Sequence, residues 1–177
     1  MRWFAFVILA LLALAVQISA GAVLRVDLGP SGLSLAVDFL AILAVWLAPR
    51  VRQNADAALA GWVLGLLVDL ASVGTPIGLY ALGFALASAM VFQVRAAVFG
   101  DNPLTQAVMA LAFCLVAHGT ARLFVHVYVR DGAGRLGWDL LQALLVALCT
   151  AVAAPFVIGV LRRLDGLIVP RPSRRRR

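Results

Sequence analysis

Three charged side chains stand inside long apolar runs of the sequence: Asp38, Asp69 and Arg122. An ionised group at the centre of a bilayer costs about 2.5 to 3.5 kcal/mol on insertion scales, so each needs a partner or water. At about 1.5 Å per helical residue, all three lie roughly 6 to 9 Å below the same membrane surface. Their opposite charges favour one cluster, with at least one Asp paired with Arg122. The alternative is that each side chain reaches the interface separately.

A second polar pattern falls on a single predicted helix. His118, Arg122 and His126 recur at every fourth residue and therefore share one helix face. Such a stripe could relay protons or contact a ligand, or it could be a polar face bonded to neighbouring helices. We expect the second, and we place His118 in the intramembrane cluster with Asp38, Asp69 and Arg122.

Small residues indicate where two helices come into close contact. Gly61 and Gly65 stand four residues apart, as in the small-xxx-small pattern of membrane helices. Gly78 and Gly83 extend this small surface into the next apolar run. We therefore expect Gly61, Gly65 and Gly78 to pack helices together.

The composition requires lipid around most of the chain. Hydrophobic residues make up 64% of the 177 residues and charged residues only 13%, with a mean hydropathy of +1.02. A soluble protein of this size needs a far more polar surface. We predict an all-α integral membrane protein, residues 1–164, with six transmembrane helices in one bundle. The predicted spans are 3–24, 33–48, 57–73, 77–94, 104–128 and 138–161.

The first span carries a possible signal-peptidase site near 20–22. Its apolar stretch is longer than the roughly 7 to 15 residues of a signal peptide, and further spans follow, so we favour an uncleaved helix.

The arginines set the predicted orientation. The net charge is +7, and all fifteen basic residues are Arg. They fall in short connections and in the tail, 165–177, a pattern of membrane topology rather than of nucleic-acid binding. If both termini are cytoplasmic, eleven Arg lie inside and three outside. We therefore expect a multi-pass membrane protein with both termini in the cytoplasm, whose basic tail can touch anionic lipids.

Enzymatic motifs are lacking in the sequence. It contains no Walker loop, no GxSxG and no HExxH. Cys114 and Cys149 lie in apolar runs without a metal-ligand pattern, so we predict neither a disulfide nor a metal site. We expect no enzyme activity and no cofactor.

Three segments together resemble the rod shape-determining protein MreD family: 38–50 (DFLAILAVWLAPR), 61–70 (GWVLGLLVDL) and 76–82 (PIGLYAL). That family shows an Asp-headed apolar run ending in Trp and a basic turn, then a Gly-xxx-Gly helix with Asp, then a Gly-Leu-Tyr/His-Ala-Leu segment. The match covers about a quarter of the chain. Val45 replaces a frequent aromatic residue of the family, and the long basic tail is not part of its pattern.

The resemblance implies a non-enzymatic membrane scaffold or regulator of the bacterial cell-wall elongation machinery, which maintains cell shape. Its partner would be MreC, and through MreC indirectly MreB, RodA and a class B penicillin-binding protein. The family is also similar in fold to the S component of energy-coupling factor transporters. The alternative function is therefore a substrate-binding membrane subunit of a small-molecule uptake transporter.

Overall fold

A computed structural model covers residues 1–177, and most of the chain that it describes is helical. The predicted tail, 165–177, lies outside the described residues. The described residues are 3–24, 26–27, 33–72, 76–98, 102–128 and 136–164.

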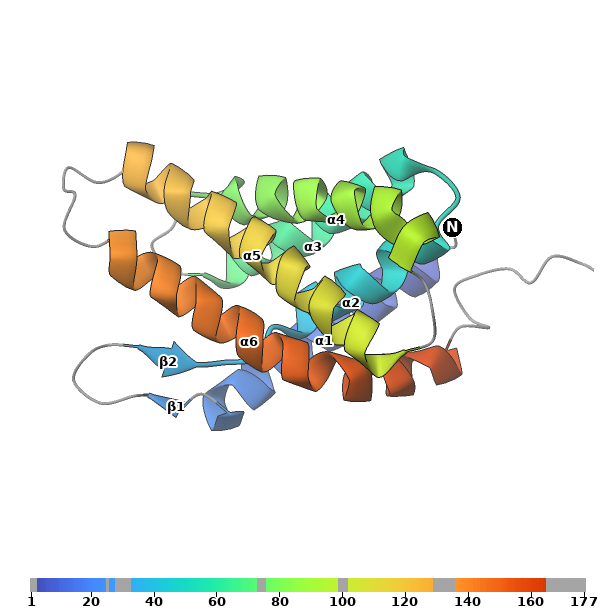
Figure 1. Ribbon diagram of the computed structural model, residues 1–177, viewed down its shortest axis with the longest axis horizontal. Helices are drawn as coiled ribbons and strands as arrows, with labels where there is room; N and C mark the ends of the chain where they lie inside the picture. Colours follow the sequence, from blue (N-terminus) through green and yellow to red (C-terminus); the bar gives the residue numbers. More distant parts are fainter. Residues whose placement is uncertain are drawn as a thin grey trace, which may run out of the picture.

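Six α-helices and one short hairpin make up the described part of the chain (Figure 1). Two short 3-10 turns, η2 (Ala48–Arg50) and η3 (Arg162–Leu164), continue the second and sixth helices. The hairpin pairs β1 (Val26–Asp27) with antiparallel β2 (Ser34–Leu35). The helices are α1 (Trp3–Leu24), α2 (Phe39–Leu47), α3 (Asn54–Ala71), α4 (Leu79–Val98), α5 (Pro103–Tyr128) and α6 (Leu136–Leu161).

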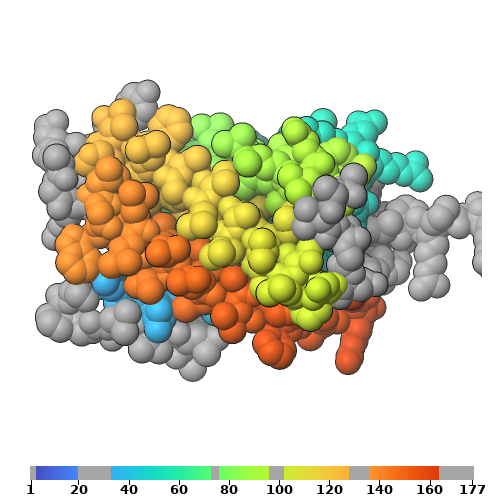
Figure 2. All heavy atoms as spheres, viewed as in Figure 1, coloured from blue at the N-terminus to red at the C-terminus, as the bar shows by residue number. Residues whose placement is uncertain are grey.

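Three of the helices are long and apolar enough to cross a membrane, and they lie within α3, α5 and α6. Shorter apolar helical stretches lie at 3–19, 39–50 and 79–95. Many large apolar side chains point outward, such as Phe4 at 82% exposed and Phe156 at 76% exposed. Such a surface is favourable against lipid and costly against water. The fold is therefore a helical bundle in which three helices could cross a membrane, and Figure 2 shows the face built mainly from α5 and α6.

Helix α2 is the centre of the bundle, with the other helices arranged around it (Figure 1). Every residue from Leu40 to Leu47 is buried. It packs against α1, where Phe6 and Ala10 belong to the same core and are at most 2% exposed. A helix that is apolar all round is the kind that other protein elements can surround completely.

The helix predicted over 33–48 begins later than expected. The chain is extended at Ser34–Leu35, and α2 starts only at Phe39, after Asp38. Asp38 has extended backbone angles (φ −95°, ψ 95°) and caps the helix with its side chain. Asp is a strong helix N-cap, because its oxygen accepts a bond from a free backbone N–H. Of the residues before it, Ser34 and Leu35 form β2 instead. The other predicted spans, 3–24, 57–73, 77–94, 104–128 and 138–161, correspond to the remaining helices with ends shifted by a few residues at most.

Glycines bring α3 and α4 into backbone contact. A Cβ built on Gly61 would lie 2.5 Å from the Phe84 carbonyl oxygen, and one built on Gly65 would lie 2.6 Å from Ala81 Cα. Both distances are too short for a real side chain, so only glycine allows this approach. The structure thus places Gly61 and Gly65 at the close helix contact that their spacing predicts.

Gly78 has a different role from the one predicted. A Cβ on Gly78 would meet nothing within 4 Å, so Gly78 does not pack helices together. Its φ of +107° is the reason for glycine here, because side-chain-bearing residues rarely adopt that conformation. It bends the chain immediately before α4. The packing glycine of α4 is Gly83, whose Cβ would lie 2.5 Å from the Ala117 carbonyl oxygen of α5.

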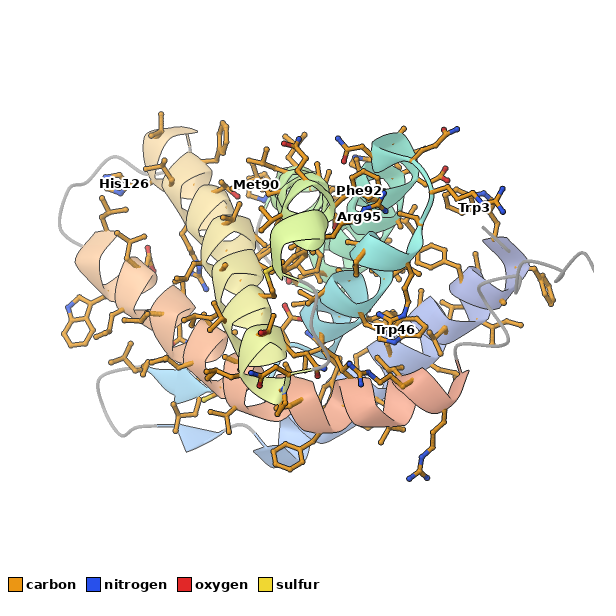
Figure 3. All side chains as sticks on the ribbon, turned by 45° about the vertical axis from the view of Figure 1, so that its right-hand side comes forward. Trp3, Trp46, Met90, Phe92, Arg95 and His126 are labelled. Atoms are coloured by element: carbon orange, nitrogen blue, oxygen red, sulfur yellow. The ribbon has the colours of Figure 1, made fainter. Side chains whose placement is uncertain are left out.

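An arginine ties together the elements at one end of the bundle. Helix α1 begins and α6 ends at the same end (Figure 1), and η2 lies there too. Arg95, near the end of α4, donates to the carbonyl oxygens of Val51 (2.8 Å) and Pro49 (3.4 Å). Its guanidinium also lies 3.8 Å from the ring centre of Phe92, beside it in Figure 3. Arg95 therefore holds the turn after α2 against the end of α4.

The close contact between α3 and α4 gives the first prediction. We expect Gly65→Ala to lower the free energy of unfolding by about 1 to 3 kcal/mol, because the added methyl group must push two backbones apart. Reversible unfolding in mild detergent by added dodecyl sulfate, followed by circular dichroism, measures this change.

The matched control is Gly119→Ala in α5, where a Cβ would meet nothing within 4 Å. Helix propensity alone predicts no loss there and a gain of up to about 1 kcal/mol. Equal stability of the Gly65→Ala and Gly119→Ala proteins would contradict the close packing.

Candidate functional site

The candidate site is built around the start of α2, in the interior of the bundle. Asp38 Oδ1 accepts a hydrogen bond from the Ala41 amide at 3.0 Å. The Asp38 amide donates to Thr150 Oγ1 of α6, also at 3.0 Å. Asp38 is 3% exposed and Thr150 is fully buried. The carboxylate thus satisfies a free backbone N–H of α2 at a position that water does not reach.

His118 of α5 completes the surroundings of this carboxylate. Its Nε2 lies 3.0 Å from Asp38 Oδ2 in a buried contact. The imidazole meets two aromatic rings edge on, Tyr80 at 5.5 Å and Phe84 at 6.4 Å between centres. With a proton on Nε2, the histidine donates to the carboxylate in either charge state. The structure therefore brings together two members of the predicted cluster, Asp38 and His118.

Two amide side chains support the same region from α1 and α6. Gln17 Oε1 accepts from the Leu40 amide at 3.1 Å, which satisfies a second N–H at the start of α2. Gln142 bonds both backbone groups of Ser34: its Oε1 accepts from the amide at 2.9 Å, and its Nε2 donates to the carbonyl at 2.7 Å. The side-chain amide of Gln142 thus bonds the backbone of β2 as a neighbouring strand would, and it connects the hairpin to α6.

Sequence reasoning missed these neutral partners: Gln17, Thr150 and Gln142. The available signal was weak, because a single amide or hydroxyl in an apolar run costs little on its own. Gln17 is nevertheless the only amide side chain in the α1 sequence. An isolated amide in a span is a reason to expect a backbone partner on a neighbouring helix.

Asp69 caps a different helix. Its Oδ2 accepts from the amides of Gly78 (2.9 Å) and Ala81 (3.1 Å), and its Oδ1 accepts from the Tyr80 amide at 3.2 Å. Asp69 is 2% exposed and lies near the end of α3. It therefore joins the end of α3 to the start of α4, and its charge is balanced by backbone N–H groups. The positive end of the α4 dipole adds to this stabilisation.

Arg122 pairs with neither Asp38 nor Asp69, so that prediction is wrong. Among the described residues, its ion pair is with Asp139 of α6, at 3.5 Å between Nη1 and Oδ1. The antiparallel packing of α5 and α6 places the first turn of α6 beside Arg122. The side chains of Arg122 and Asp139 are 34% and 20% exposed, so the pair is less buried than the Asp38–His118 contact.

Tyr80 lies beside both capped carboxylates, through its amide at Asp69 and through His118 at Asp38. It is 8% exposed. Its amide donates to Asp69, and its ring lies 5.5 Å from that of His118 between centres. Tyr80 thus connects the surroundings of Asp69 with those of Asp38 and His118, whereas Arg122 pairs with Asp139.

The histidine and arginine stripe on α5 does not act as one continuous face. His118 is buried and Arg122 is partly exposed. His126 lies in the last turn of α5, at the opposite end of the bundle from Arg95 of α4 (Figure 3). His118 bonds to a neighbouring helix, as the structural interpretation of the stripe predicts. Arg122 also binds a neighbouring helix, through Asp139.

The described residues offer no ready metal centre. Within them, no group of three His, Cys, Asp or Glu side chains is arranged to hold a metal ion. Cys114 is buried beside this region and is a free thiol, as is the partly exposed Cys149. The buried groups of the site are bound to helix starts and to one another, which is the chemistry of a structural polar centre.

Comparisons with protein-family models, with curated proteins and with solved structures gave no match.

The Asp38–His118 contact gives the second prediction, a double-mutant cycle with Asp38→Asn and His118→Gln. Buried partners in one hydrogen-bond network show coupling energies of about 0.5 to 3 kcal/mol. We expect the double variant to be at least about 1 kcal/mol more stable than the sum of the two single losses predicts. Unfolding in detergent gives the four free energies that are required.

A parallel cycle on Asp56→Asn and His118→Gln is the control, because Asp56 lies in the first turn of α3 and makes no contact with His118. Additivity in both cycles would contradict a direct Asp38–His118 interaction.

Proposed function

We propose that the chain is a six-span protein of a bacterial cytoplasmic membrane, with both termini in the cytoplasm. The arrangement of helix ends supports this topology. Helix α1 begins, and α6 ends, at the end of the bundle that carries η2 (Figure 1). Arg50, Arg52, Arg95, Arg162 and Arg163 all belong to segments at that end. Cytoplasmic connections are the ones enriched in Arg.

In this topology α2 crosses only part of the bilayer as a helix. The extended segment before Asp38 and the hairpin complete the crossing on the outer side. Non-helical backbone is tolerated at that depth when protein covers it. The bonds from Gln142 to Ser34 and from Thr150 to Asp38 provide such cover.

We further propose a non-enzymatic scaffold function, in the manner of the MreD family. The protein would maintain cell shape with MreC and, through MreC, with MreB, RodA and a class B penicillin-binding protein. The observation that carries this proposal concerns the two carboxylates of the resemblance. All four oxygens of Asp38 and Asp69 accept hydrogen bonds within the bundle or contact His118. Carboxylates used in this way position helices and are not available for catalysis.

The other residues of the resemblance also have structural positions. Gly61 and Gly65 allow the contact between α3 and α4, Gly78 supplies the bend before α4, and Trp46 is buried at the end of α2. The pattern shared with the family thus describes how helices α2 to α4 are held together. A rigid bundle with a lipid-facing surface suits a scaffold that presents helices to a partner.

The topology gives the third prediction. We expect a C-terminal alkaline phosphatase fusion to be inactive and a C-terminal green fluorescent protein fusion to fluoresce, since both report a cytoplasmic end. Fusions at residue 132, in the connection between α5 and α6, should give the opposite pair of results. A periplasmic readout at the C-terminus would overturn the six-span topology.

The partner gives the fourth prediction. We expect the tagged full-length chain to recover MreC from membranes of its host in mild detergent, identified by mass spectrometry. A polytopic membrane protein of similar size with the same tag is the control. The same purified sample, extracted and analysed for bound vitamins, tests the uptake-subunit alternative. A stoichiometric vitamin without MreC would replace the scaffold proposal with that alternative.

A further inference from the structure

An apolar hollow lies between α4 and α5 and is partly open to the outside of the bundle. Its volume is about 140 Å³. The lining residues run from Ala87 to Val94 on α4 and from Met109 to Val116 on α5. All of those that the structure describes are apolar. An occupant of this hollow therefore has to be apolar as well, because its walls offer a polar group no side-chain partner.

The hollow exists because α4 and α5 diverge. Near Gly83 the two backbones touch, since a Cβ on Gly83 would lie 2.5 Å from the Ala117 carbonyl oxygen. From there the helices separate toward the end of α4 and the start of α5 (Figure 1). Phe84 and Phe113 fill the space next to the contact, with ring centres 5.2 Å apart. Beyond these rings the helices are too far apart for their side chains to close the gap.

The hollow is elongated along the two helices. On each helix its lining residues have the spacing i, i+3, i+4 and i+7, which is one face over two turns. At about 1.5 Å per residue, this face is about 10 Å long. Met90, labelled in Figure 3, and Val94 belong to its α4 wall and are 47% and 41% exposed. The hollow is thus a trough that runs parallel to the helices and opens sideways.

The depth of the trough corresponds to one leaflet of a bilayer. Val94 stands four residues before the end of α4 at Val98, and Ala87 stands eleven residues before it. At about 1.5 Å per residue, the trough extends from roughly 6 to 17 Å below this helix end. Half of a hydrocarbon core is about 15 Å thick. In the proposed topology, the trough therefore lies among the acyl chains of the cytoplasmic leaflet and has their direction.

The size of the trough distinguishes between apolar occupants. In another protein, an apolar cavity of about 150 Å³ holds benzene, so about six chain carbons fit a space of this size. A helix with its side chains is about 10 Å wide and cannot enter such a space. An empty trough would leave its wall atoms without dispersion contacts on one side. The flexible side chains of Met90 and Met109 can adapt to a chain that fills it.

We propose that this trough binds one acyl chain of a membrane lipid. The proposal rests on a membrane around α4 and α5, as in the proposed topology, and it does not depend on the scaffold function. A large side chain from the helix of a partner protein is the other occupant that the shape permits, and the experiment distinguishes the two.

The test is photo-crosslinking of the full-length protein in phosphatidylcholine vesicles. A small fraction of the lipid carries a diazirine in its acyl chain, and peptide mass spectrometry locates the adducts. The reference surface is the exposed face of α6 from Leu148 to Phe156. We expect at least about threefold more adducts per residue on 87–94 and 109–116 than on that face, because a chain in a trough contacts more protein atoms.

Ala112→Phe fills the trough, and the exposed position of Ala112 leaves room for the larger side chain. It should lower the adducts on 87–94 and 109–116 at least about threefold and leave those on α6 unchanged. Gly119→Phe is the matched control on the same helix, because Gly119 has open space around it and does not line the trough. We expect it to change the adducts at the trough less than about twofold. Val116→Phe fills the trough from its other end and provides a second test.

Equal numbers of adducts per residue on the trough and on α6 would overturn the proposal, since they would indicate general contact with the bilayer. The adducts on α6 show that the protein is embedded, so this result would leave the membrane topology intact. The partner alternative is tested in membranes of the host, with p-benzoylphenylalanine in place of Ala112. We expect a lipid adduct at this position, and a polypeptide adduct would overturn the proposal.

Discussion

The arrangement of the bundle depends on how the start of α2 is satisfied in apolar surroundings. A helix that begins inside the bundle presents free backbone N–H groups, and each one left without a partner in lipid costs several kcal/mol. Asp38 and Gln17 accept two of these bonds, while Thr150 accepts from the residue before the helix. His118 contacts the carboxylate of Asp38. Helices α1, α5 and α6 each contribute one of these groups, so the start of α2 fixes all three.

This constraint separates the structural residues from those that remain for function. Asp38 and Asp69 perform the same task at two helix starts, because a carboxylate that binds backbone N–H groups can be buried without a cation. The glycines at positions 61 and 65 add the close contact of α3 with α4. The interior is then occupied by residues that hold the helices together, and the exposed apolar surface is what remains for a partner or for lipid. This division supports a scaffold more than a transporter or an enzyme.

The sequence predicts helices well here, since apolar runs of about 20 residues have few alternatives in lipid. The spacing of Gly61 and Gly65 likewise predicts contact, because residues four apart share a helix face. Asp38 shows the limit: an apolar run does not distinguish a helix from an extended segment, so the true start of α2 was missed. Arg122 shows a second limit of sequence-based prediction, because its ion pair with Asp139 depends on how far α5 and α6 are shifted along each other. For Gly78, the backbone angle that requires glycine cannot be read from its neighbours.

The central claim is that Asp38 organises α2, and hydrogen–deuterium exchange of the full-length protein in mild detergent tests it most directly. Peptides from 39–47 should be among the most slowly exchanging in the wild-type protein. In an Asp38→Ala protein we expect these peptides to exchange at least about tenfold faster, since the loss of a cap costs about 0.5 to 2 kcal/mol and each buried donor left unpaired adds to it. Peptides from the contact of α3 with α4 should keep their protection. Unchanged exchange of 39–47 in the Asp38→Ala protein would contradict the account.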